Sequence, residues 1–207
     1  MKTRKNLILL TLGMLAITGC KNQTEKTSTD AAGAQNDSLS FHKTVSLKNI
    51  SFDISTSGEG SIRQLYIQPA GLSIDNRKLT HQIDGKVIDA EIEDLNSDGY
   101  PEMVIYTQSA GSGSYGDVIA YSVNNGKSVS SAYLPPISDH PEASIGYMGH
   151  DEFTIIESSL ARRFPIYREG DTNSNPTGGL RQIQYKLVDG EASRSFEVTT
   201  ITDYPPN

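Results

Sequence analysis

Hydrophobic and polar side chains alternate along most of the chain after residue 45. In residues 181–187 every second side chain is apolar: Ile183, Tyr185 and Leu187. Residues 86–93 show the same spacing with Ile88, Ala90 and Ile92. A period of two is typical of strands with one buried face, because successive side chains of a strand point to opposite sides of the sheet. The pattern therefore predicts many short strands and no long amphipathic helix.

Four dipeptides that favour tight turns punctuate these predicted strands: Asp84-Gly85, Asp98-Gly99, Asn125-Gly126 and Asp189-Gly190. Glycine after Asn or Asp supplies the positive φ angles that short hairpin loops need. Short strands joined by hairpins predict an all-β fold, a sandwich or a barrel. We expect a single domain that forms an antiparallel β-sandwich.

The first residues of the chain have a different composition. Three positive residues precede an apolar segment at 7–17, which is shorter than a membrane span and typical of a signal peptide. The segment ends in ITGC, which resembles the lipobox of bacterial lipoproteins, and Cys20 is the only cysteine of the chain. An ordinary signal peptide with an accidental cysteine is the alternative interpretation.

These features predict the organisation of the chain. We expect a lipoprotein signal peptide at 1–19, a lipidated Cys20 with a polar, disordered tether at 20–44, and the β-sandwich domain at 45–207. With Cys20 lipidated, the mature chain has no thiol for a disulfide, a thiol nucleophile or a cysteine-based zinc site.

The charge of the chain narrows the choice of partner. The net charge is −7 at pH 7, and it becomes −10 once the three positive residues of the signal peptide are removed. This charge argues against nucleic acid as a partner, because nucleic-acid binding depends on Lys and Arg at the phosphates. It suits a cationic partner, although solubility alone also accounts for it.

Residues 109–116, SAGSGSYG, form a loop of small residues with one large side chain, Tyr115. Three glycines of this loop have the spacing G-x-G-x-x-G: Gly111, Gly113 and Gly116. A dinucleotide-binding fold would need a helix directly after these glycines, whereas residues 117–123 alternate like a strand. We therefore disfavour a cofactor site here.

The same loop raises the possibility of a serine hydrolase. Ser112 and Ser114 are hydroxyl candidates, and the chain has four histidines. A hydrolase elbow has the sequence G-x-S-x-G between a strand and a helix, and neither that sequence nor that helix is indicated. The residues of the loop thus do not point to an enzyme.

Residues 94–102, DLNSDGYPE, carry oxygen-bearing side chains at the spacing of a calcium loop: Asp94, Asn96, Asp98 and Glu102. An EF-hand would need a glutamate at its twelfth position, where Ile105 stands. Two interpretations stay open, a shorter calcium hairpin and an Asx-rich turn whose side chains bond their own backbone. We favour the turn.

Two further segments have polar side chains close together. Arg162, Arg163 and Arg168 form either a basic contact strip or a strand near a sheet edge that pairs with nearby acids, and we favour the strand. His150, Asp151 and Glu152 are consecutive, so a strand would point them to alternating faces and make a poor metal site. We expect a surface turn there.

Five segments in this order resemble the periplasmic inhibitors of invertebrate-type (i-type) lysozyme: DLNSDGYPE, SAGSGSYGDVIAYS, GYMGHDEF, RRFPIY and PTGGLRQIQYKL. The resemblance covers about residues 85–190, and the ordered set is more specific than any single segment. It implies a β-sandwich that projects a short loop into the lysozyme cleft. The Ser and Tyr of the family's Ser-Gly-x-Tyr arrangement correspond to Ser112 and Tyr115, with Gly113 and Ser114 between them.

The resemblance implies a non-enzymatic inhibitor whose partner is an i-type lysozyme and which needs no cofactor. Lysozyme places two carboxylates in a narrow cleft. A thin loop with Ser and Tyr hydroxyls offers those carboxylates hydrogen-bond donors and no glycosidic bond. The alternative is a cell-envelope carbohydrate- or peptidoglycan-binding β-domain in which Tyr115 stacks on sugar.

The expected location is the bacterial cell envelope, with membrane contact only through the lipid on Cys20. Lys21 follows this cysteine, where an acidic residue often retains lipoproteins at the inner membrane. We therefore favour the outer membrane.

Overall fold

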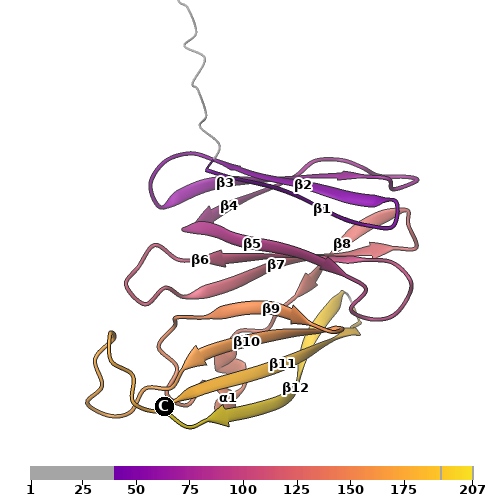
Figure 1. Ribbon diagram of the computed structural model, residues 1–207. Helices are drawn as coiled ribbons and strands as arrows, with labels where there is room; N and C mark the ends of the chain where they lie inside the picture. Colours follow the sequence, from indigo (N-terminus) through magenta and orange to yellow (C-terminus); the bar gives the residue numbers. More distant parts are fainter. Residues whose placement is uncertain (1–39, 192, 207) are drawn as a thin grey trace, which may run out of the picture. The chain divides into compact units, whose positions relative to one another are not determined.

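The computed structural model describes residues 40–191 and 193–206. These residues form two β-sheets, with a short helical segment between two of the strands (Figure 1). No helix among them has the length and apolar character to cross a membrane. The predicted signal peptide and the lipidated Cys20 lie outside the described residues.

The first sheet has four antiparallel strands in the order β1-β2-β3-β4. Their bounds are β1 Phe41–Leu47, β2 Ile50–Ser57, β3 Ile62–Ala70 and β4 Leu79–Asp84. Strand β1 begins ahead of Val45, where we expected the domain to start. Phe41 packs against the hydrophobic core, and the Ser40 amide donates to the Thr56 carbonyl, so this end of the chain is part of the sheet.

The second sheet has eight strands in the order β5-β6-β7-β8-β12-β11-β10-β9. Their bounds are β5 Lys86–Glu93, β6 Glu102–Gln108, β7 Gly116–Asn124, β8 Ser128–Tyr133, β9 Glu152–Ile156, β10 Ser159–Pro165, β11 Leu180–Asp189 and β12 Arg194–Tyr204. The neighbours are antiparallel, except that β8 and β12 make a short parallel pair. A 3-10 helix (Ile137–Asp139) and a one-turn helix α1 (Pro141–Ser144) connect β8 to β9.

The second sheet nearly closes on itself, because its two edge strands approach each other. The Glu91 carboxylate on β5 accepts hydrogen bonds from the Thr154 hydroxyl at 3.2 Å and from the Ile155 amide at 3.3 Å on β9. A side chain thus bridges the opening where backbone pairing is missing. Covered edges of this kind limit unwanted pairing with other strands.

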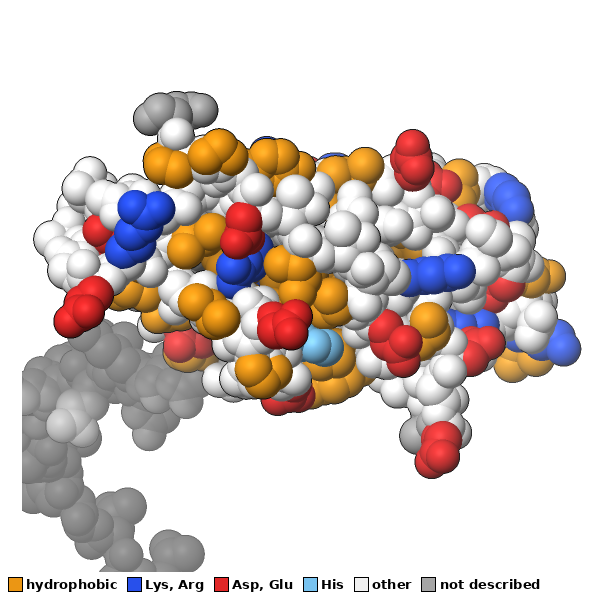
Figure 2. All heavy atoms as spheres, turned by 90° about the horizontal axis from the view of Figure 1, so that it is seen from below, with side chains coloured by type: hydrophobic (Ala, Val, Ile, Leu, Met, Phe, Trp, Pro, Cys, Tyr) orange, Lys and Arg blue, Asp and Glu red, His pale blue; other side chains and the backbone are white. Residues whose placement is uncertain are grey.

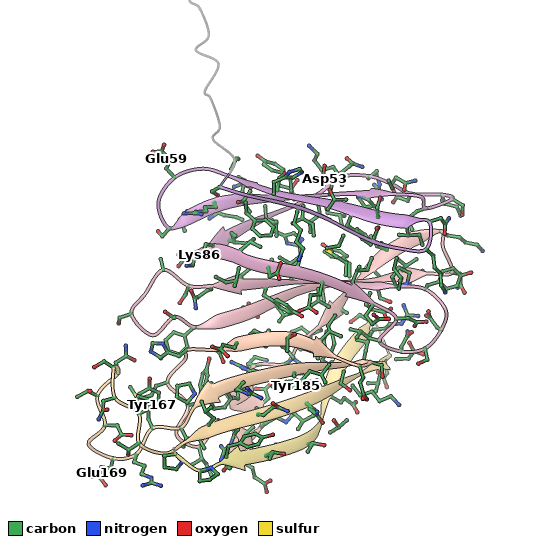
Figure 3. All side chains as sticks on the ribbon, viewed as in Figure 1. Asp53, Glu59, Lys86, Tyr167, Glu169 and Tyr185 are labelled. Carbon is green, nitrogen blue, oxygen red and sulfur yellow. The ribbon has the colours of Figure 1, made fainter. Side chains whose placement is uncertain are left out.

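Two hydrophobic clusters hold the sheets together. The first lies between β1–β4 and the β5–β7 half of the second sheet, and it includes Phe52, Ile54, Leu65 and Met103. The second lies inside the curved second sheet and includes Phe164, Ile183, Tyr185 and Phe196. Tyr185 is labelled within this lower half in Figure 3. The predicted all-β, antiparallel fold is confirmed, and the alternation in residues 181–187 marks the buried face of β11.

Strand β5 departs from the predicted alternation. A β-bulge lies between Val87 and Asp89, so both Val87 and Ala90 are buried, whereas Ile88 is 48% exposed. An extra residue in one strand moves the side chains beyond it to the opposite face. The predicted apolar set Ile88, Ala90 and Ile92 is therefore wrong at Ile88.

The turn dipeptides also differ in what they connect. Asn125-Gly126 and Asp189-Gly190 join paired strands, and Asp98-Gly99 lies in the loop between the paired strands β5 and β6. Asp84-Gly85 instead links β4 to β5, which belong to different sheets. This turn carries the chain from one layer of the sandwich to the other.

Candidate functional site

The loop between β6 and β7 carries the predicted contact residues. The Ser114 amide donates to the Gly111 carbonyl at 3.0 Å, which places Ser112 and Gly113 at the corners of a tight turn. The base of the loop is closed twice, by the Ser109 amide to the Tyr115 carbonyl at 2.8 Å and by the Tyr115 amide to the Ser109 hydroxyl at 2.9 Å. The loop therefore has a defined conformation.

Distant side chains hold the Tyr115 end of this loop. The Gly116 amide donates to the Asp151 carboxylate at 2.7 Å, and the Tyr147 hydroxyl donates to the same carboxylate oxygen at 2.7 Å. The rings of Tyr115 and Tyr147 meet edge to face, with centroids 5.8 Å apart. Both the backbone after Tyr115 and its ring are thus fixed from outside the loop.

Asp151 belongs to a buried ion pair with Arg162. Arg162 Nε donates to Asp151 Oδ1 at 2.7 Å, and the two side chains are 5% and 0% exposed. Burial alone would lower the pKa of Arg162, but the Asp151 carboxylate raises it, so the guanidinium keeps its charge. The guanidinium also lies over the Tyr147 ring at 4.9 Å.

These positions correct one expectation from the sequence and support another. We expected a surface turn at residues 150–152, yet Asp151 is buried and ion-paired. The strand interpretation of the arginines holds for Arg162, which pairs with a nearby acid and is unavailable as a contact strip. Acidic and basic side chains are interspersed on the face shown in Figure 2, which presents no continuous basic surface.

The tip of the loop, at Ser112 and Gly113, is held by a second group of residues. Asn173 Nδ2 donates to the Ser112 carbonyl at 2.7 Å, and the His150 amide donates to the Gly113 carbonyl at 2.8 Å. His150 Nε2 lies 3.1 Å from Asn173 Oδ1, which links the two holding residues. Asn173 comes from the β10–β11 connection, where Tyr167 and Glu169 are labelled in Figure 3.

Two glycines allow this close packing. A Cβ on Gly113 would lie 2.5 Å from the Tyr115 ring, so the ring packs against a bare backbone. Gly149 has a φ of +91°, and a Cβ there would overlap the Gly113 carbonyl oxygen. Larger residues at either position would push the loop off its support.

The side chains of the loop remain available while its backbone is held. Tyr115 is 49% exposed, and the structure records no hydrogen bond from the hydroxyls of Ser112, Ser114 or Tyr115 to any described residue. A groove of about 780 Å³ along β7 begins beside Tyr115. It is bordered by β4 and β8 and by residues 134–137.

The acidic loop at residues 94–102 directs its side chains differently. Asp94 accepts from the amides of Asp98 at 3.1 Å and Gly99 at 2.9 Å, and Asn96 accepts from the Asp98 amide at 3.0 Å. Asp98 accepts from the Tyr100 amide at 2.8 Å and pairs with Arg194 at 3.0 Å. This is the geometry of an Asx-rich turn.

Glu102, the fourth candidate calcium ligand, points into the core. It is fully buried and accepts from the Ser122 hydroxyl at 2.5 Å and the Leu95 amide at 2.8 Å. Burial raises the pKa of its carboxyl. In the part of the chain that the structure describes, no cluster of three His, Cys, Asp or Glu side chains is arranged to hold a metal ion.

The supporting residues were not found by sequence reasoning. Tyr147, Asp151, Arg162 and Asn173 lie in three segments distant from the loop, and none has a residue pattern that predicts a contact to it. Three of them lie within or beside the segments GYMGHDEF and RRFPIY, on which the resemblance rests. The ordered set of segments was thus a signal that distant residues act with the loop.

Comparison with known protein families gives independent evidence on this part of the chain. Residues 74–135 match the family of periplasmic lysozyme inhibitors of I-type lysozyme. The matched segment runs from the chain before β4 to the end of β8 and contains both the acidic loop and the whole loop 109–116. No curated protein shows significant similarity to the chain.

The match confirms the resemblance that the sequence motifs indicated, over the segment that carries Ser112 and Tyr115. It supports a periplasmic inhibitor of i-type lysozyme, a class of binding protein rather than an enzyme. The supporting residues Tyr147, Asp151, Arg162 and Asn173 lie beyond the matched segment.

Proposed function

We propose that the protein inhibits i-type lysozyme by inserting the loop 109–116 into the active-site cleft, and thereby protects bacterial peptidoglycan. One observation carries the proposal. Within a segment that matches the inhibitor family, the loop has its backbone held by neighbouring residues while Ser112 and Tyr115 keep hydroxyls without partners among the described residues. Such side chains are free to bond a partner.

The chemistry of the loop suits a lysozyme cleft. Two carboxylates flank the scissile bond of lysozyme, and hydroxyl donors form strong hydrogen bonds to carboxylates. The Ser112 hydroxyl and the Tyr115 phenol are such donors, and Tyr115 adds a rigid aromatic surface of the kind found at binding hot spots. Gly111 and Gly113 keep the loop thin enough for a narrow cleft.

The test is an inhibition assay with the purified protein. We expect it to block cell-wall hydrolysis by an i-type lysozyme at stoichiometric amounts, and to leave c-type and g-type lysozymes active. The alternative, a peptidoglycan-binding domain, predicts retention on insoluble peptidoglycan without inhibition of any lysozyme. These two results together would contradict the proposed inhibition and favour the peptidoglycan-binding domain.

We further propose that the inhibitor is attached to the outer membrane by a lipid on Cys20. The support is the ITGC sequence and the single cysteine. Cys20→Ser should release the protein from the membrane fraction, because no other cysteine can be lipidated. A Cys20→Ser protein that stays in the membrane fraction as the wild type does would contradict the anchor.

A further inference from the structure

We propose that Tyr147, Asp151, Arg162 and Asn173 are positioning residues that hold the loop 109–116 in its binding conformation before lysozyme arrives. The inference rests on the proposed function, because it explains how the same loop binds well. None of the four needs to touch lysozyme. Two clamps hold the loop, one directly after Tyr115 and one at the tip of the turn.

The first clamp, which we call the carboxylate clamp, consists of Tyr147, Asp151 and Arg162. The Asp151 carboxylate accepts three hydrogen bonds of 2.7 Å, from Arg162 Nε, the Tyr147 hydroxyl and the Gly116 amide. Arg162 Nη2 also donates to the Tyr147 hydroxyl at 2.8 Å. Hydrogen bonds to an ionised group are stronger than neutral ones, and a buried carboxylate that loses a donor finds no water to replace it.

The carboxylate clamp acts directly on Tyr115. Gly116 follows Tyr115 in the chain, so its bond to Asp151 fixes the backbone at that point. The Tyr147 ring supports the Tyr115 ring from the side and itself packs edge to face on Phe164, with centroids 4.9 Å apart. A movement of Tyr115 toward another conformation therefore disturbs a buried network.

The second clamp, the amide clamp, consists of Asn173 with His150. The side-chain amide of Asn173 donates to the Ser112 carbonyl, and its oxygen lies within hydrogen-bond distance of His150 Nε2. The His150 backbone amide holds the Gly113 carbonyl. Both corners of the turn are thus tied to residues outside the loop, and the Ser112 side chain stays free.

Such clamps favour binding because ordering a flexible loop costs conformational entropy. A loop rich in Gly and Ser has many conformations when it is unrestrained, and it would lose that freedom on entering a cleft. A loop already fixed in its bound conformation avoids this loss at the moment of binding, so its affinity is higher for the same contacts.

The test uses one variant for each clamp in the full-length protein. Tyr147→Phe keeps the ring against Tyr115 but removes the hydroxyl that bonds Asp151 and Arg162. Asn173→Ala removes the bond to Ser112 in the β10–β11 connection, outside the two hydrophobic clusters. We expect each variant to weaken inhibition of i-type lysozyme by roughly five- to twentyfold. Asn175→Ala, in the same connection but without a side-chain bond to the loop, is the matched control and should inhibit as the wild type does.

A second readout separates positioning from direct contact or general destabilisation. Hydrogen exchange of the free protein should accelerate at the Gly116 amide in Tyr147→Phe and at the Ser114 and His150 amides in Asn173→Ala, while core strand amides stay protected. In a Tyr115→Ala background, Tyr147→Phe should change inhibition by less than about twofold, because it acts through Tyr115.

The outcomes have distinct meanings. If the wild type inhibits, and both variants retain wild-type inhibition and wild-type exchange in the loop, the positioning role is wrong. If Tyr147→Phe weakens inhibition equally with and without Tyr115, it acts elsewhere and the positioning role is likewise wrong. Absence of inhibition by the wild type would instead overturn the proposed function, and faster exchange in the two variants would still show that the clamps hold the loop.

Discussion

The two loops at the ends of β6 differ both in composition and in how their backbones are held: the loop before β6 is acidic, and the loop after it consists mostly of Ser and Gly. The loop before β6, residues 94–101, turns its carboxylate and amide oxygens onto its own backbone. In the loop after β6, residues 109–115, the Ser112 and Gly113 carbonyls and the Gly116 amide that follows the loop are bonded by residues of other segments. The backbone of the first loop is held mainly by its own side chains, whereas the tip and the end of the second loop are held by its neighbours.

The difference indicates which loop has side chains available for a partner. A side chain that accepts hydrogen bonds from the backbone of its own loop cannot move away without leaving amide donors unpaired. Its role is therefore to stabilise the loop. A loop whose backbone is held from outside keeps its side chains for intermolecular bonds. The sequence presents both loops as candidate ligand sites, and their hydrogen bonds distinguish them.

The largest effect is expected where the support of the second loop is removed. Asp151→Ala leaves the Arg162 guanidinium buried without its counter-ion, and breaking such a pair typically costs about 3–5 kcal/mol in the free energy of unfolding. Urea denaturation measures this loss. Asp189→Ala is the control, because its carboxylate pairs with Arg194 while 84% exposed, and we expect little change there. Wild-type stability of Asp151→Ala would mean that the carboxylate does not support the fold.

The next effect concerns the side chain that the second loop presents. Tyr115→Ala removes an aromatic anchor and a donor, and truncation of such a hot spot typically costs about 2–4 kcal/mol of binding, roughly 30- to 1,000-fold in affinity. Inhibition constant and melting temperature are measured together, and the melting temperature should hardly change because the ring is half exposed.

The control for Tyr115 is another exposed tyrosine. Tyr204, at the end of β12, is 42% exposed, and Tyr204→Ala should leave inhibition unchanged. If Tyr115→Ala inhibits i-type lysozyme as well as the wild type, the loop is not the inserted element and the contact surface lies elsewhere.

The contrast between the loops also shows which features of the structure can be predicted from the sequence. Alternation predicted β11, and the composition of residues 109–116 predicted a thin loop between strands, because both depend on neighbours in the chain. The bond from Gly116 to Asp151 spans 35 positions and that from Asn173 to Ser112 spans 61. Such contacts depend on how strands are arranged across the sheet, and no local pattern encodes that arrangement.

The errors have the same origin. Asp151 looked like part of a surface turn because polar residues surround it, yet the fold brings Arg162 to it from the neighbouring strand. Ile88 looked like a core residue because its spacing was regular, and a bulge in β5 moved it to the surface. A period of two fixes which residues share a face only where the strand is regular.

A smaller effect is expected in the loop before β6. Asp94→Ala removes the acceptor of two backbone amides, those of Asp98 and Gly99, and we expect a loss of about 1–2 kcal/mol in the free energy of unfolding. Inhibition should stay at the wild-type level, because this loop does not support residues 109–115. Loss of inhibition with unchanged stability would mean that the acidic loop takes part in binding.

The smallest effect is the response to calcium. Three of the four candidate ligands, Asp94, Asn96 and Asp98, already accept backbone amides, and the Arg194 guanidinium lies against Asp98. A calcium ion would have to displace those amides and approach a positive charge, so binding would break the hydrogen bonds that form the turn.

An ion that binds only the folded state raises the melting temperature once its concentration passes the dissociation constant. We therefore expect the same melting curve in EDTA and in millimolar calcium. A calcium-dependent rise that Asp94→Ala abolishes would show that the loop rearranges to bind the ion, and the two loops at the ends of β6 would then both be ligand sites.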